Sequence, residues 1–161
     1  MFNLLRQKMS AAAVLSELLQ AAETEARQDG QSQPGAEHLV LAALSLPDGE
    51  AVRALMSLDL TGDDVRGAIA RQYDEPLKSL GIERSLDTQP LGPVSKASLY
   101  RAAPSGQALI QALAKDCRSP LTSARVLLAA AEQSHGVLPR ALKLLGVDIA
   151  RFREAALAAQ A

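Results

Sequence analysis

Few residues of this chain have the chemistry that catalysis or metal binding requires. The 161 residues include two histidines, His38 and His135, and one cysteine, Cys117. A zinc site usually takes its His and Cys ligands at short, regular spacings, and neither histidine has such a neighbour. A cysteine nucleophile needs a base beside it, and no local signature pairs Cys117 with a histidine. We therefore expect no metal, no cofactor and no catalytic residue.

The acidic residues that lie in pairs are typical of helix starts. Thr61 is a good N-cap residue, and Asp64 three positions later supplies the acidic half of a capping box. Glu37 and His38 are neighbours at another expected helix start. Glu37 is either a first-turn acid that favours the helix dipole or part of a binding site. The sequence also lacks a G-x-x-x-x-G-K-[S/T] phosphate loop, so an enzyme is not expected.

The composition favours a helical protein with an aliphatic core. Hydrophobic residues make up 48% of the chain, charged residues 22% and aromatic residues only 2%. Strands prefer β-branched and aromatic residues, which are sparse here. The formal net charge is −1 and no basic stripe is visible, which disfavours nucleic acid as a partner.

The sequence also bears on cellular location. No run of residues is apolar enough for a membrane span, so no membrane partner is expected. Near the amino terminus, Ser16 and Glu17 interrupt an apolar run that is too short for a secretory signal, and a helix is the better interpretation. A single cysteine allows no internal disulfide, which fits a reducing compartment. We predict a cytoplasmic protein.

Apolar residues recur at spacings of three and four along most of the chain, as in amphipathic helices. The first such segment covers residues 10–29 and ends at Gly30. Further helices are predicted over residues 36–45, 50–58, from Thr61 onward, 105–116, 122–134, 137–145 and 148–160. Residues 74–104 hold prolines and glycines among polar residues, so we predict a linker there with one helical turn near Leu77–Leu80.

The two helical regions are copies of one unit. An offset of 87 residues places Leu39 opposite Val126 and aligns the remaining segments without a gap. The identical pairs include Leu41/Leu128, Ala42/Ala129, Ala43/Ala130, Gly49/Gly136, Arg53/Arg140, Ala54/Ala141, Leu55/Leu142, Leu58/Leu145, Arg66/Arg153 and Ala68/Ala155. Shared cores and helix ends are what a duplication preserves. The copies are predicted to differ at their start, where copy two has a shorter connection after its first helix and has lost about a turn.

Four segments resemble a known family. Residues 22–27 read AETEAR and residues 35–44 read GAEHLVLAAL, while the ends of the third helices read LMSLDL over 55–60 and LKLLGVD over 142–148. These resemble the amino-terminal domain of Clp/Hsp100 unfoldases, with its G-T-E-H-L run and L-x-x-L-G-V-D/S boundary. The resemblance covers nearly the whole chain, residues 1–161. It implies an all-α fold in which two four-helix units, about eight helices, form a tandem pseudo-twofold repeat joined by the proline-containing linker. Repeat one then covers about 10–73, the linker about 74–104, and repeat two about 105–160.

The resemblance implies a non-catalytic module that docks adaptor or substrate proteins for a Clp-type ATP-dependent unfoldase or protease. The chain is expected to be either a stand-alone copy of the domain or an excised part. The alternative is a diverged stand-alone protein that acts as a regulator or decoy for another machine. An enzyme would need a polar cleft with several perturbed titratable groups, and a helical DNA-binding protein is disfavoured by the charge.

The candidate partner-binding residues are Phe2, Gly35, Ala36, Glu37 and His38. Phe2 either packs into the core or lines a docking groove at the repeat junction with the helix start at Gly35. Some members of the family bind phosphoarginine through the Glu of a T-E-H motif in each repeat. Here Glu37 is retained and Ala36 replaces the Thr. The aligned positions of copy two, 124 and 125, hold Ala and Arg, so the resemblance does not carry this ligand over simply.

Overall fold

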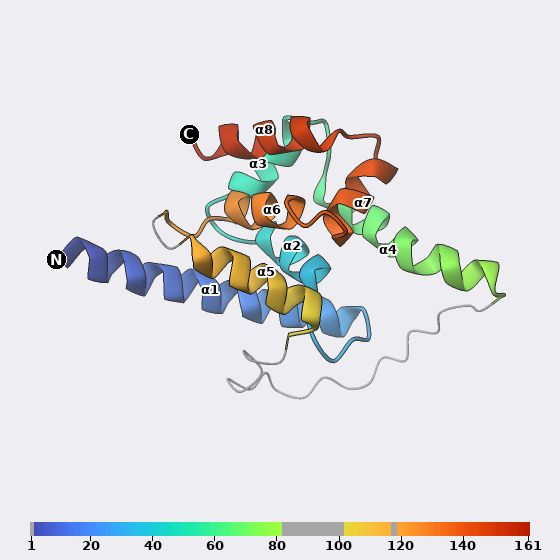
Figure 1. Cartoon of the computed structure of the whole chain (residues 1–161), viewed down its shortest axis with the longest axis horizontal. Helices are drawn as coiled ribbons and strands as arrows, with labels where there is room; N and C mark the ends of the chain where they lie inside the picture. Colours follow the sequence, from blue (N-terminus) through green and yellow to red (C-terminus); the bar gives the residue numbers. More distant parts are fainter. Residues whose placement is uncertain (1, 82–101, 117–118) are drawn as a thin grey trace.

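The protein is all-helical throughout the part of the chain that the structure describes. The computed structural model describes residues 2–81, 102–116 and 119–161, with side chains described except at 2–9, 75, 77 and 78. The helices in this part are α1 (Phe2–Gln28), α2 (Ala36–Ala43), α3 (Glu50–Met56), α4 (Gly62–Ser79), α5 (Pro104–Lys115), α6 (Ser123–Ala131), α7 (Val137–Leu144) and α8 (Ile149–Ala159). Figure 1 shows their arrangement. The predicted fold class is confirmed.

The predicted helix starts agree with the structure to within one residue from α2 onward. Side-chain caps explain two of them. At α4, the backbone N–H of Thr61 donates to Asp64 Oδ2 at 2.8 Å, and the N–H of Asp64 donates to Thr61 Oγ1 at 3.2 Å. At α8, Asp148 Oδ2 accepts from the Ala150 N–H at 3.1 Å. These side chains satisfy backbone donors that a helix start leaves without partners.

Two predicted boundaries are wrong. Helix α1 begins at Phe2 and not near residue 10, and α4 continues through Pro76 to Ser79, into the predicted linker. Proline removes the N–H that would reach the Gln72 carbonyl, and its ring crowds that carbonyl. Pro76 is exposed and lies in the projecting end of α4, where few packing contacts depend on an undistorted helix. The predicted linker positions 82–101 lie outside the described residues.

The duplication is precise in the structure. Helices α6, α7 and α8 begin 87 residues after α2, α3 and α4, and the last residues of α1 and α5, Gln28 and Lys115, are also 87 apart. The prediction of a longer connection in copy one is therefore wrong, because residues 29–35 and 116–122 are equally long. The copies differ at the other end of the first helix, which has 27 residues in α1 and 12 in α5.

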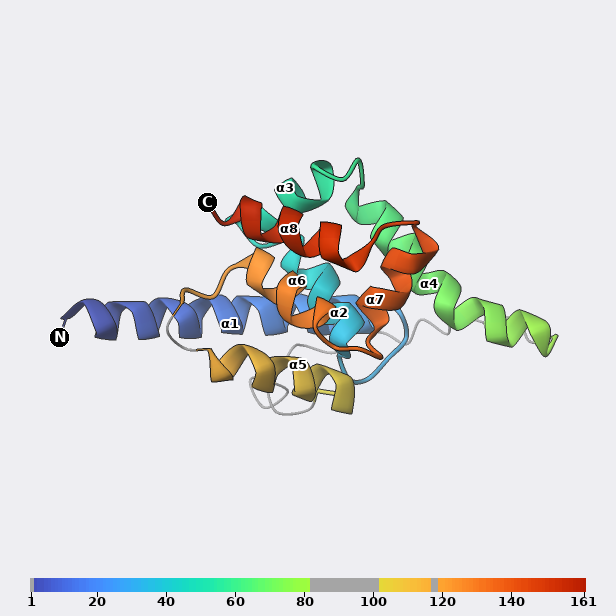
Figure 2. The same cartoon turned by 45° about the horizontal axis from the view of Figure 1, so that its top comes forward.

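The repeats exchange helices across a shared core. Helix α3 of repeat one packs on α8 of repeat two, and α7 of repeat two packs on α4 of repeat one. Helices α2 and α6 pack on each other in the middle, with α1 and α5 on one side and α3 and α8 on the other (Figures 1 and 2). The fully buried Leu39, Leu127 and Phe152 belong to one core cluster that both repeats build. Neither repeat therefore has a separate core.

Two helix ends of repeat one project beyond this body. The amino-terminal part of α1 and the carboxyl-terminal part of α4 extend on opposite sides in both views (Figures 1 and 2). None of the described helices combines the length and apolarity needed to cross a bilayer.

Candidate functional site at the start of helix α2

His38 closes the first turn of α2 from inside the protein. The N-cap residue Gly35 has no side chain, so the usual hydroxyl or carboxylate cap is missing. The Gly35 N–H instead donates to His38 Nδ1 at 2.9 Å, while His38 Nε2 lies 3.1 Å from Asp29 Oδ2. Because Nδ1 accepts a hydrogen bond from the Gly35 N–H, a neutral His38 carries its proton on Nε2, and this N–H donates a hydrogen bond to Asp29. The imidazole is fully buried and fixed at both nitrogens.

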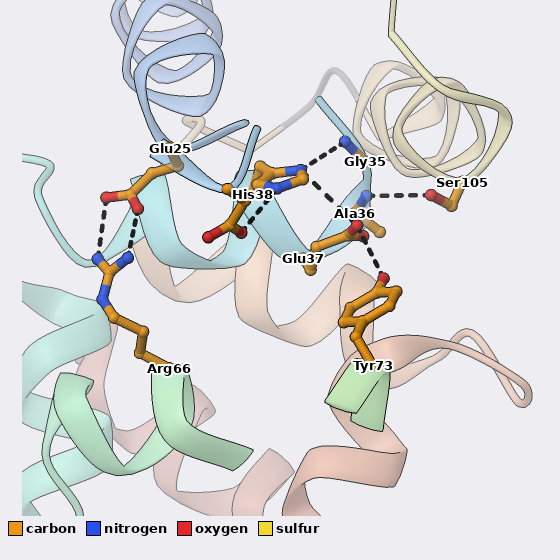
Figure 3. Close-up of polar contacts among 9 residues, drawn as sticks. Glu25, Gly35, Ala36, Glu37, His38, Arg66, Tyr73 and Ser105 are labelled. Carbon is orange, nitrogen blue, oxygen red and sulfur yellow. Dashed lines mark hydrogen bonds and ion pairs between the residues drawn. The ribbon is translucent and has the colours of Figure 1, made fainter. Parts of the chain in front are cut away.

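The start of α5 covers the start of α2. The Ala36 N–H donates to Ser105 Oγ at 3.2 Å, and the Ala103 N–H donates to the Pro34 carbonyl at 3.0 Å. A Cβ at Gly106 would lie 2.6 Å from that same carbonyl oxygen. Only glycine permits so close an approach of two backbones. The second repeat thus contributes a wall of this site (Figure 3).

Glu37 lies between His38 and α4: its Oε1 is 3.7 Å from His38 Nδ1, and Tyr73 of α4 meets the same carboxylate (Figure 3). The Tyr73 hydroxyl donates to Glu37 Oε1 at 2.9 Å, and Glu37 is only 5% exposed. Burial raises the pKa of Tyr73 to about 12, with the negative charge of Glu37 adding to the effect. The phenol therefore stays protonated at neutral pH and acts as a donor. A Cβ at Gly35 would lie 2.5 Å from Glu37 Oε2, so a larger residue there would displace this carboxylate.

An ion pair flanks the cluster and ties α1 to α4. The Arg66 guanidinium contacts both carboxylate oxygens of Glu25, at 2.6 and 3.0 Å (Figure 3). The hydrogen bond to Glu25 raises the pKa of Arg66. This two-point geometry is the more specific form of an Arg–carboxylate contact.

The start of α6 in repeat two is closed by a different set of groups. Thr122 is the N-cap and accepts from the Arg125 N–H at 3.4 Å. The Asp48 carboxylate, which belongs to repeat one, accepts from the Ser123 N–H at 3.0 Å, from the Glu50 N–H at 2.9 Å and from the Ser123 hydroxyl. Ser123 Oγ in turn accepts from the Ala51 N–H at 2.8 Å and is fully buried. A carboxylate thus occupies this helix start from within the molecule.

One polar pair recurs in both repeats. Arg125 lies 87 residues after His38, and Asp116 lies 87 residues after Asp29. Arg125 Nη2 is 3.3 Å from Asp116 Oδ2, and its guanidinium also donates to the carbonyls of Asp116, Ser119 and Pro120. In each repeat, the side chain of the third residue of the second helix therefore contacts the segment that connects the first helix to the second. Extending the repeat alignment backward from Leu39 to the Asp29/Asp116 pair would have found this contact.

The structure brings together four of the five predicted site residues. Gly35, Ala36, Glu37 and His38 are adjacent and all buried, and their polar groups are bonded to other parts of the chain. Phe2 starts the other end of α1, a helix whose 27 residues span roughly 40 Å at 1.5 Å per residue. Its side chain lies outside the described part. Sequence reasoning missed Asp29, which is nine positions from His38. It also missed Tyr73 and Ser105, which are 36 and 69 positions from the residues that they contact.

The cluster has the features of a structural polar network. No group of three His, Cys, Asp or Glu side chains in the described ranges is arranged to hold a metal ion. The shared core, the exchanged helices and the closed helix starts define a duplicated all-helical domain. The chain matches the model of the Clp repeat N-terminal domain family over residues 8–114, which is more than half of its length, and it belongs to that family. None of the curated proteins gives a significant match.

Proposed function

We propose that this protein is a protein-binding module that docks adaptor or substrate proteins for a Clp-type ATP-dependent unfoldase. Membership of a family of non-catalytic amino-terminal domains, associated with protein binding in Clp machines, supports this function. As part of the proposal we place its action in the cytoplasm, since a single cysteine fits a reducing compartment.

The observation that carries the proposal is a set of exposed apolar side chains on α3 and α8, two helices that pack together, and we propose that they form one apolar surface. Met56 on α3 is 67% exposed, Leu157 on α8 is 57% exposed, and Val52 lies one turn from Met56 at 40%. Exposed large apolar side chains on neighbouring helices are a feature of protein interaction sites. The expected occupant is an apolar segment of an adaptor or a partly unfolded substrate, because the family docks such proteins.

In this proposal the four residues at the start of α2 shape the module and hold its repeats together. Their polar groups bond to Asp29 directly after α1, to the start of α5 and to Tyr73 of α4. A partner that contacted Glu37 directly would have to displace Tyr73. We therefore expect Glu37 and His38 to affect docking by fixing the positions of these helices.

A pull-down with defined components tests the docking function. The full chain would be immobilised and offered purified Clp-type ATPase, its adaptors and a chemically unfolded client protein, each separately. We expect at least one of them to be retained, and the variant Met56→Asp/Leu157→Asp to lose that retention. Leu80→Asp is the matched control, because Leu80 is also an exposed leucine, at 73%, but lies beyond the end of α4. Retention of none of the components would contradict the proposal.

The difference between the two helix starts supports a second candidate, a regulator or decoy that has left the usual docking role. Positions 124 and 125 hold Ala and Arg where repeat one has Glu37 and His38. Adding the purified chain to a reconstituted Clp degradation reaction separates the two. A decoy would inhibit degradation by competing for adaptor or substrate, and the inhibition would be overcome by adding more adaptor. A docking module joined to its ATPase would support degradation.

A further inference from the structure

The face formed by α4 and α7 is the repeat-related counterpart of the apolar surface on α3 and α8. Each face combines the third helix of one repeat with the fourth helix of the other. Gln72 Nε2 on α4 donates to the Val137 carbonyl on α7 at 3.1 Å, which fixes these two helices side by side. Both views show α7 against the body-side half of α4 (Figures 1 and 2).

The two related faces differ in charge. Lys143 stands where the other face has Met56, and Arg71 stands where it has Ala158. Arg140 repeats Arg53. All three basic residues on the α4/α7 face, Arg71, Arg140 and Lys143, are exposed. Gly67, Ala70 and Pro139, which are exposed or half-buried on the same two helices, carry no charge.

The cations on this face have no carboxylate partner among the described residues. Elsewhere in the described ranges, Arg66 pairs with Glu25, Arg125 with Asp116 and Arg153 with Glu132. Arg140 donates through Nε to the Gly136 carbonyl at 3.3 Å, which leaves both of its terminal nitrogens available. Asp74 follows Arg71 by one turn on α4, is half-buried and forms no ion pair with it. The described side chains of this face thus carry an excess of positive charge.

We propose that the α4/α7 face of Arg71, Arg140 and Lys143 binds an acidic segment of a partner protein. This inference rests on the proposed protein-binding function and names the chemistry of a second contact. Carboxylates complement unpaired guanidinium and ammonium groups, and such contacts steer association as well as add affinity. Nucleic acid fits the face less well. Three cations make a small phosphate footprint, and the hydroxyl of Tyr73, two positions after Arg71 on α4, is bonded to Glu37.

Binding of a labelled peptide of ten glutamates to the full chain at low salt is the direct test. The variant Arg71→Glu/Lys143→Glu changes two exposed residues that make no hydrogen bond or ion pair in the described structure. We expect it to weaken binding by about tenfold, as two attractive contacts become repulsive. Lys115→Glu/Arg151→Glu is the control, since it gives the same net charge with both changes at exposed positions outside the face. The control should bind the peptide as the unchanged chain does.

Each outcome supports or overturns the acidic-segment assignment. Binding that the face variant loses and the control keeps supports it, particularly if added salt weakens the binding. Equal losses in both variants would show a net-charge effect, and no binding to the unchanged chain would remove the site altogether. A ten-nucleotide single-stranded DNA bound more tightly than the peptide, with the same dependence on Arg71 and Lys143, would assign the face to nucleic acid. Binding of the glutamate peptide without binding of any Clp component would support this site and contradict the proposed function.

Discussion

The starts of α2 and α6 occupy the same position in the two repeats and are closed by different groups. At α2 an imidazole, a serine of the other repeat and a tyrosine surround the turn, whereas at α6 a threonine cap and the Asp48 carboxylate do so. The unpaired N–H groups of a helix start are dictated by helix geometry. The related N–H groups of Ala36 and Ser123 both have an acceptor, Ser105 Oγ in one case and the Asp48 carboxylate in the other. A duplicated helix start can therefore keep a donor satisfied while the group that accepts from it is replaced.

One polar contact is kept in both repeats, between an aspartate and the third residue of the second helix. Asp29 and Asp116 both hold the side chain at the third position of the second helix, although that side chain is His38 in one copy and Arg125 in the other. An Arg donates only, whereas His38 must also accept from Gly35. In repeat two the helix start is capped by the Thr122 hydroxyl, which accepts from the Arg125 N–H, and the Arg125 side chain acts as a donor alone.

Exchanging the residue types of His38 and Arg125 should have the largest effect on stability. His38→Arg places a guanidinium in a fully buried site and removes the acceptor for the Gly35 N–H. We expect a loss of roughly 3 kcal/mol in the free energy of unfolding, since both a buried charge and an unsatisfied donor result. Urea denaturation would measure it. Arg125→His, in a more exposed site, should lose only about 1 kcal/mol, and equal losses would show that the two starts are interchangeable after all.

Removing the Asp48 carboxylate at the start of α6 should have the second largest effect on stability. Asp48→Ala leaves the buried Ser123 hydroxyl and its backbone N–H without their acceptor. A loss of about 2 kcal/mol is expected from unsatisfied buried donors. Thermal unfolding monitored by circular dichroism would detect it, with Asp63→Ala at the exposed start of α4 as a control. A stability unchanged from that of the control would mean that water replaces the carboxylate.

The contact between Tyr73 and Glu37 exists in repeat one alone, because Gln160 and Ala124 stand at the related positions. Tyr73→Phe should cost about 1 kcal/mol at neutral pH. The pKa of Tyr73 is raised from 10.0 to about 12 in the folded protein. The folded state therefore holds this proton more tightly, so the stabilisation is complete below pH 10 and is lost as the pH rises through 10 to 12.

Unfolding curves across that pH window would check the prediction. The decline in stability that belongs to Tyr73 should be missing in Tyr73→Phe, and Glu37→Gln should bring the tyrosine titration closer to its ordinary pKa. An identical alkaline decline in the unchanged chain and in Tyr73→Phe would contradict the assignment.

The smallest effects on stability are expected from exchanging the surfaces. Met56→Lys and Lys143→Met each give one face the residue of the other, and both positions are exposed. Unfolding free energies should change by no more than about 0.5 kcal/mol. Binding should change instead. Met56→Lys should weaken docking to α3 and α8, and Lys143→Met should weaken glutamate-peptide binding to α4 and α7. If either exchange affected both kinds of binding, the two faces would not be separate sites.

Much of the fold could be predicted from the sequence because its determinants are local. Thr61 with Asp64, and Asp148, mark helix starts by side chains within three residues of the donors that they satisfy. The offset of 87 located the repeat because buried positions and glycines recur. The extension of α4 was missed because Pro76 normally ends a helix, and no neighbouring residue signals that this end projects from the body.

The candidate site was predictable only in part. Gly35 to His38 were identified from a short motif, but their burial depends on residues far away in sequence. Ser105 lies 69 positions from Ala36, and Tyr73 lies 36 positions from Glu37. The contact from Asp48 to Ser123 spans 75 positions. No local pattern reports such pairings, because they follow from how the two repeats cross.

Because the third helix of each repeat packs on the fourth helix of the other, dividing the chain between the repeats should separate helices that need each other to fold. Each half of the chain carries helices whose buried sides face the other half, as α3 does toward α8. Two separately produced fragments, 1–81 and 102–161, should each be poorly folded and should recover helical structure when mixed. The domain would then serve as a split reporter, in which assembly of the halves restores both binding faces at once.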